Sequence, residues 1–115
     1  MYRMLIVDDE RIIRETLSRH IDWAALDVQV IGTASNGLEA YDIIMDEYPD
    51  IVMTDIKMPG FSGLELLQRI KSLHPDIEFI LLSGYGEFEY AQKAMQWGVL
   101  SLIHISEPTR LALIS

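Results

Sequence analysis

The chain has 115 residues, a formal charge of −9 and no cysteine. This length fits one domain. The lack of cysteine excludes disulfide bonds and thiolate chemistry, so a metal would need oxygen or imidazole ligands. The negative charge argues against direct binding of nucleic acid, because phosphate contacts need a surface rich in Lys and Arg. We expect a cytoplasmic chain without membrane contact, since no apolar run approaches the roughly 20 residues that cross a bilayer and no cleavable signal pattern is present.

Short apolar runs alternate with amphipathic stretches, which is typical of a parallel sheet built from repeated strand–helix units. The predicted strands are residues 4–7, 28–34, 51–54, 77–82 and 99–105. The predicted helices are residues 10–20, 37–48, 63–73 and 87–97.

Each predicted helix has apolar residues at helical spacing, which predicts one face turned toward the sheet. The residues expected on these faces are Ile13, Leu17 and Ile21; Tyr41, Ile44, Met45 and Tyr48; Leu64, Leu67 and Ile70; and Phe88, Ala91 and Met95.

Crossovers between parallel strands are right-handed, so five strands with four intervening helices predict a doubly wound α/β sheet. We expect the flavodoxin-like strand order 2-1-3-4-5, with helices on both faces. In this order the first and third strands are neighbours at the topological switch point, where such sheets bind ligands.

Asp55 directly follows the buried strand at residues 51–54, and Pro59 and Gly60 then turn the chain. It should therefore lie at the carboxyl end of that strand, beside the ligand-binding crevice. The alternative interpretation is an acid that only opens a turn.

Asp8 and Asp9 follow the first predicted strand, and the expected strand order brings them within reach of Asp55. Three converging carboxylates repel one another unless a cation neutralises them, and oxygen ligands suit Mg²⁺ or Mn²⁺. Taken alone, the run Asp8-Asp9-Glu10 is also explained by helix capping and by compensation of the helix dipole.

Taken together, these motifs resemble the receiver domain of two-component response regulators. The matching motifs are Asp8-Asp9, Asp55, Met58-Pro59-Gly60 with Gly63, and Ser83-Gly84. The resemblance spans about residues 2–100.

The resemblance implies that Asp55 accepts a phosphoryl group from a sensor histidine kinase with the help of Mg²⁺. It implies Asp9 as a direct metal ligand, Asp8 as a ligand acting mostly through water, and the backbone carbonyl of Lys57 as a further ligand. Ser83 matches the switch hydroxyl that hydrogen-bonds the attached phosphoryl group. By this resemblance the chain is a signalling domain that assists its own phosphorylation and dephosphorylation, not an enzyme with a separate substrate.

Three segments are similar to receivers that precede AraC-type helix-turn-helix domains: residues 21–23, 32–37 and 82–91. The resemblance therefore implies a transcriptional regulator whose DNA-binding output domain is not in this chain.

The chain departs from the receiver pattern near its end, so we divide it into a receiver domain at 1–100 and an atypical tail at 101–115. Leu102 stands where the family has an aromatic switch residue, and Ile105 stands where it has a lysine. The tail is also too short for a full final helix. Residues 101–110 resemble a translated sequencing adapter, and our hypothesis is a truncated or chimeric reading frame.

Two other functions stay open at this point. A phosphatase with an aspartate nucleophile is one, although such sites carry a second Asp two residues on, where this chain has Lys57. A phosphorylation-independent interaction module is the other. The oligomeric state is also open.

Overall fold

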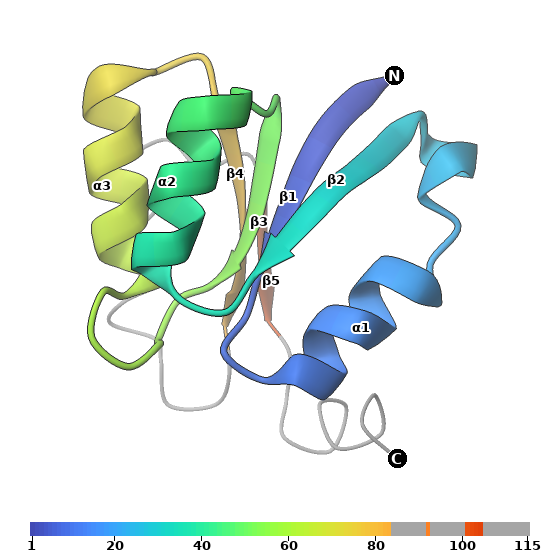
Figure 1. Cartoon of the computed structure of the whole chain (residues 1–115), viewed down its shortest axis with the longest axis horizontal. Helices are drawn as coiled ribbons and strands as arrows, with labels where there is room; N and C mark the ends of the chain where they lie inside the picture. The colour runs from blue at the N-terminus through green and yellow to red at the C-terminus, as the bar shows by residue number, and fades with distance from the viewer. Residues whose placement is uncertain (84–91, 93–100, 105–115) are drawn as a thin grey trace.

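The computed structural model describes residues 1–83, 92 and 101–104. Within them lies a five-stranded sheet with the order β2-β1-β3-β4-β5, and all its pairings are parallel (Figure 1). This order confirms the predicted doubly wound topology. The strands are β1 (Tyr2–Val7), β2 (Val28–Ala34), β3 (Ile51–Asp55), β4 (Glu78–Ser83) and β5 (Ser101–His104).

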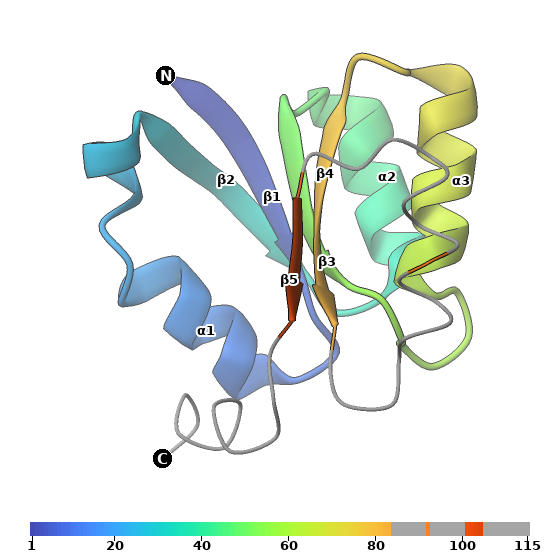
Figure 2. The same cartoon turned by 180° about the vertical axis from the view of Figure 1, so that it is seen from behind.

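Helices cover both faces of the sheet (Figures 1 and 2). Helix α1 (Arg11–Arg19) lies on one face, whereas α2 (Gly37–Glu47) and α3 (Gly63–Leu73) lie side by side on the other. A 3₁₀ helix, η1 (Trp23–Leu26), links α1 to β2. The helix predicted at 87–97 lies outside the described residues except for Gln92, which is helical. The predicted truncation of the final helix, after residue 104, also lies outside them.

Polar caps fix where α2 and α3 begin. The Asn36 side chain accepts a hydrogen bond from the Glu39 backbone N–H at 2.8 Å, and Ser62 Oγ accepts one from the Glu65 N–H at 3.2 Å. Each cap satisfies one of the backbone donors that the first turn leaves without a partner. The start of α2 at Gly37 and both bounds of α3 therefore match the prediction.

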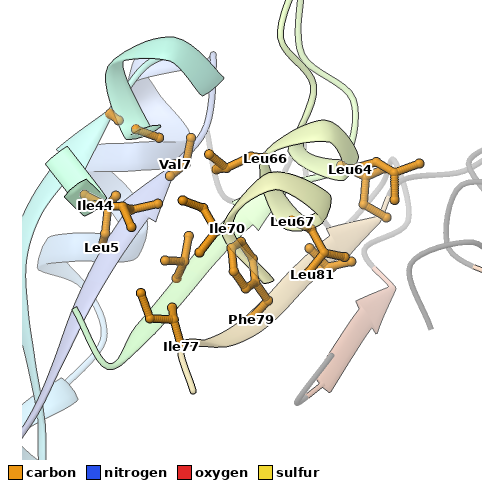
Figure 3. Packing of buried hydrophobic residues seen from close by; sticks show 14 of the residues in the cluster. Leu5, Val7, Ile44, Leu64, Leu66, Leu67, Ile70, Ile77, Phe79 and Leu81 are labelled. Atoms are coloured by element: carbon orange, nitrogen blue, oxygen red, sulfur yellow. The ribbon is translucent and has the colours of Figure 1, made fainter. Parts of the chain in front are cut away.

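The larger apolar core lies between the sheet and the α2–α3 layer (Figure 3). Leu64, Leu67 and Ile70 of α3 are buried in it, as the helical spacing predicts. A second cluster lies on the α1 face, where Ile13 and Leu17 pack against β1, β3 and β4. Both faces of the sheet thus carry packed side chains, which holds the strand ends in a fixed arrangement.

Three predicted core positions are wrong. Ile21 is 39% exposed because α1 ends at Arg19 and the helical spacing stops there. Tyr48 is 55% exposed, since it is the left-handed C-cap of α2, and its ring instead packs edge-on against His74. Met45 is 36% exposed, and the buried face of α2 consists of Gly37, Ala40 and Ile44.

Candidate functional site

The acidic residues at the ends of β1 and β3 are neighbours in the sheet. Val7 of β1 pairs with Thr54 of β3, so Asp8 and Asp55 are the next residues on adjacent strands. Neighbouring strands lie about 4.8 Å apart. The structure therefore brings these two predicted site residues together at the carboxyl edge of the sheet.

The alternation of side chains along each strand also directs both acids to the same face. Ile6 and Met53 belong to the cluster on the α1 face, and Asp8 and Asp55 follow them at the spacing of two residues that keeps a side chain on one face. Asp8 is fully buried, and Asp55 is only 5% exposed. Both carboxylates are thus shielded from solvent at the same edge of the sheet, where hydrogen bonds or a cation can offset their charge.

Asp8 has a structural role as well as a candidate metal role. Its Oδ1 accepts a hydrogen bond from the Glu10 backbone N–H at 2.9 Å. The Arg14 guanidinium donates to the Asp8 backbone oxygen at 2.7 Å. The capping interpretation of this acidic run is not confirmed, because the N-cap Glu10 makes no side-chain cap hydrogen bond and the first turn of α1 carries no acid; Asp8 instead holds the turn that precedes α1. Arg14 was not predicted from the sequence; the signal that could have found it is a basic residue in the first turn of a helix that follows an acidic loop.

A cluster of carboxylates suitable for a cation lies at the end of β1. Among the described residues, Asp8, Asp9 and Glu10 each offer a ligand oxygen, and these atoms lie within 4.8 Å of one another. Glu10 was not in the predicted ligand set, whereas Asp55 was, and Asp55 lies outside this group of three. Asp9 and Glu10 are exposed, so a cation could reach them from solvent. Oxygen donors alone fit a hard cation such as Mg²⁺.

The Asp55 backbone is tightly enclosed on the side of α3. Thr54 is fully buried, and its Oγ1 donates a hydrogen bond to the Asp55 carbonyl oxygen at 2.9 Å. Gly63 approaches the same carbonyl so closely that a Cβ there would overlap the oxygen. The preceding turn uses Gly60 with a φ of 74°, a left-handed conformation that favours glycine. Gly60 and Gly63 belong to the motifs predicted from the sequence, whereas Thr54 does not, because its sequence context is that of an ordinary strand residue.

The remaining predicted site residues, Ser83 and Lys57, lie at the same edge of the sheet. Leu82 of β4 pairs with Asp55, and Ser83 is the next residue and the last of that strand. The Ile56 N–H donates to the Leu82 oxygen at 3.3 Å, which holds the two strand ends together. Lys57 follows two residues after Asp55, and its side chain is exposed.

A second acidic group lies at the opposite, amino-terminal edge of the sheet. Asp50, Asp76 and Glu78 line a cavity of about 350 Å³ together with Tyr2 and Ile51. The sheet separates this group from Asp8 and Asp55, so the two acidic regions can be tested independently.

A doubly wound parallel sheet with acidic residues at the ends of its first and third strands defines a flavodoxin-like α/β protein with an anionic site at the switch point. The family model described as the response regulator receiver domain matches residues 4–108. The chain belongs to the response regulator receiver domain family, and it is a receiver of the kind found in two-component transcriptional regulators.

Two curated relatives are transcriptional regulators. The chain is 50% identical over 99 residues to the uncharacterized transcriptional regulatory protein YesN of Bacillus subtilis. The aligned residues cover 86% of this chain and 27% of YesN. It is 42% identical over 103 residues to the transcriptional regulatory protein HptR of Staphylococcus aureus, and the aligned residues cover 90% of this chain and 40% of HptR. The chain thus spans between about a quarter and two fifths of the length of these relatives.

Solved structures show the same fold. The receiver domain of AraT, a response regulator from Geobacillus stearothermophilus, is 34% identical with a TM-score of 0.84, covering 96% of this chain and 87% of that one. A two-component transcriptional regulator AraC from Clostridium phytofermentans is 34% identical with a TM-score of 0.82, and the match covers 99% of this chain and 87% of that one. These names agree with the predicted resemblance to receivers of AraC-type regulators.

In the part of the chain that the structure describes, no helix is long and apolar enough to span a membrane.

Proposed function

We propose that Asp55 is the phosphoacceptor of this receiver and takes a phosphoryl group from a phosphohistidine on a sensor kinase. The observation that supports the proposal is the pairing of Val7 with Thr54, because Asp8 and Asp55 are the next residues after this pair at the carboxyl edge of the sheet. Asp55 lies at the end of its strand, where the crevice opens beyond the sheet. A carboxylate in this position can attack the phosphorus in line with the departing histidine nitrogen.

The acidic loop after β1 would hold Mg²⁺. Asp9 would hold it directly, Asp8 would contribute mainly through water, and the Lys57 carbonyl and Asp55 would complete the set. Mg²⁺, when bound, offsets the negative charge on the phosphoryl oxygens. The exposure of Asp9 supports direct binding, and the hydrogen bond from the Glu10 N–H to Asp8 supports an indirect role for Asp8, because one of its oxygens is already engaged.

Ser83 would transmit the phosphorylation of Asp55 to the rest of the domain. Its hydroxyl would donate to the new phosphoryl group, so that a local change in charge shifts the equilibrium between two conformations of the domain. Water then hydrolyses the acyl phosphate and restores Asp55. In the cytoplasm this cycle would control a DNA-binding output domain outside this chain.

Transfer from a small phosphate donor tests the proposal. The chain is incubated with acetyl phosphate and Mg²⁺, and intact mass is followed with time. We expect one phosphoryl group per chain, with none on Asp55→Asn and strongly reduced transfer on Asp9→Asn. Calorimetric titration should show weak Mg²⁺ binding that Asp9→Asn abolishes. Equal labelling of the parent and Asp55→Asn would overturn the assignment of the phosphoacceptor.

The same variants address the two alternatives. Steady turnover of a small phosphate ester would indicate a phosphatase. Binding of a partner that is unchanged in Asp55→Ala would indicate a phosphorylation-independent module. Lys57 occupies the position of the second aspartate expected in a phosphatase, which favours the receiver function.

A further inference from the structure

The Thr54 side chain is a buried hydroxyl that the metal and phosphoryl chemistry above does not use. It is fully shielded from solvent, on the last strand residue before Asp55. A buried hydroxyl needs a hydrogen-bond partner, and Thr54 Oγ1 finds one in the Asp55 carbonyl oxygen at 2.9 Å. The bond thus ends on the backbone of the proposed phosphoacceptor.

Thr54 and Asp55 point to opposite faces of the sheet. Val52 lies in the cluster under α2 and α3, and Thr54 follows it on that face, whereas Met53 lies in the α1-face cluster and Asp55 follows it there. The Thr54 hydroxyl therefore acts on the Asp55 peptide group from behind. It does not approach the carboxylate from the crevice.

Gly63 encloses the same carbonyl from the α3 side. A Cβ at this position would overlap the Asp55 oxygen, and the Gly63 N–H donates to the Ile56 oxygen at 2.8 Å. The peptide that follows Asp55 is thus held between a buried hydroxyl and the first residue of α3. The orientation of this peptide determines where the Asp55 side chain leaves the strand.

We infer that Thr54 is a positioning residue for phosphoryl transfer, which fixes the Asp55–Ile56 peptide through its hydroxyl and so aligns the Asp55 carboxylate. The inference rests on the proposed function of Asp55. Reactions that depend on in-line geometry are sensitive to small displacements of the attacking group. The loss of one neutral hydrogen bond, about 1 kcal/mol, corresponds to a several-fold change in rate if it is expressed in the transition state.

The test compares Thr54→Val, which keeps the shape and removes the hydroxyl, with Thr54→Ser, which keeps the hydroxyl. Thr33→Val is the matched control, because Thr33 is an exposed threonine on β2. Rates of labelling by acetyl phosphate are measured at saturating Mg²⁺ and over a range of donor concentrations. Mg²⁺ affinity and the free energy of unfolding are measured on the same samples.

We expect Thr54→Val to lower the maximal labelling rate by about threefold to tenfold, with Mg²⁺ affinity changed less than about twofold. Thr54→Ser and Thr33→Val should label within about twofold of the parent by the same reasoning. A purely structural role would lower the stability of Thr54→Val and leave the rate per folded chain unchanged, which would overturn the inference. If Thr54→Val does not fold, an unchanged rate in Thr54→Ala would overturn it equally. Failure of the parent to become labelled at Asp55 would instead contradict the proposed function itself.

Discussion

Asp8 combines a backbone contact with a candidate metal role, and two substitutions can separate them. Asp8→Asn removes the charge but keeps an oxygen for the Glu10 N–H, whereas Asp8→Ala removes both. We expect Asp8→Ala to be less stable than Asp8→Asn by about 0.5–1.5 kcal/mol, the usual contribution of one hydrogen bond. Both variants should lose Mg²⁺ affinity.

Urea denaturation in the absence of metal measures the difference in unfolding free energy, and calorimetry measures Mg²⁺ binding. Equal stability of the two variants would show that the bond to Glu10 does not contribute. Unchanged Mg²⁺ affinity in Asp8→Asn would remove Asp8 from the proposed metal site.

Gly63 should be among the glycines that tolerate a side chain least. A Cβ at Gly63 overlaps the Asp55 carbonyl, so Gly63→Ala forces the backbone apart and should cost about 1–3 kcal/mol or more of unfolding free energy. Gly32 is the matched control, since a Cβ there would meet no atom within 4 Å. Gly32→Ala should be neutral or more stable by up to about 1 kcal/mol, because alanine restricts the unfolded chain.

Thermal and urea unfolding of the two glycine variants check this expectation. Similar stability of Gly63→Ala and Gly32→Ala would mean that α3 can move away from Asp55 at little cost. The close approach would then not be a constraint on the site.

At the scale of elements, the helix and strand pattern was predictable where periodicity and end signals agree. The ranges of β2 and α3 match the prediction, since β2 is a β-branched run and α3 begins at a serine cap and ends before Pro75. Periodicity does not show where a helix stops, so Ile21 and Tyr48 were wrongly placed in the core. The 3₁₀ helix η1 was not predicted, because it depends on local contacts such as the Ala25 N–H donating to Asp22.

The candidate site also contains residues that the sequence predicts and residues that only the local contacts identify. Asp8, Asp9 and Asp55 could be found from the sequence because strand ends and the switch point follow from topology alone. Thr54 and Arg14 could not, since each acts through one hydrogen bond to a backbone oxygen, and no spacing rule encodes such a contact. Glu10 was visible in the sequence as part of the acidic run, but its ligand oxygen was found beside those of Asp8 and Asp9 only once the turn after β1 was known.

We predict a functional defect in the sequence after residue 104. Ile105 stands at the position of the family's lysine, outside the described residues, so a positive charge toward the phosphoryl oxygens is expected to be missing. Rebuilding the residues after Val99 to the receiver pattern should accelerate labelling by acetyl phosphate by about a hundredfold, as restoring one preorganised electrostatic contact does elsewhere.

The comparison of this chain with the rebuilt chain also tests signal transmission. Beryllofluoride, a phosphoryl mimic, should perturb the site in both chains and change the oligomeric state, if at all, only in the rebuilt one. Equal labelling rates would show that the tail is not a defect. Independently of these rates, the nucleotide sequence downstream of Gly98 would decide whether the tail arose from a shifted reading frame.

At the scale of the whole molecule, the strand order follows from right-handed crossovers, and this order creates the switch point between β1 and β3. The same topology separates two acidic regions at opposite edges of one sheet. In a chain with a net charge of −9, acidic clusters alone do not identify a metal site. We therefore expect Mg²⁺ binding that depends on Asp9 at the carboxyl edge and not at the amino-terminal edge.

An NMR titration of backbone amides, first with Mg²⁺ and then with beryllofluoride, tests whether Asp55 is the phosphoacceptor of a metal site at the carboxyl edge of the sheet. We expect Mg²⁺-induced shifts at Asp8, Asp9 and Asp55, and further shifts on addition of beryllofluoride that vanish in Asp55→Asn. Amides of Asp50, Asp76 and Glu78 at the opposite edge should stay unchanged. Shifts centred on those three residues, or a beryllofluoride response that persists in Asp55→Asn, would show that Asp55 is not the phosphoacceptor of such a site.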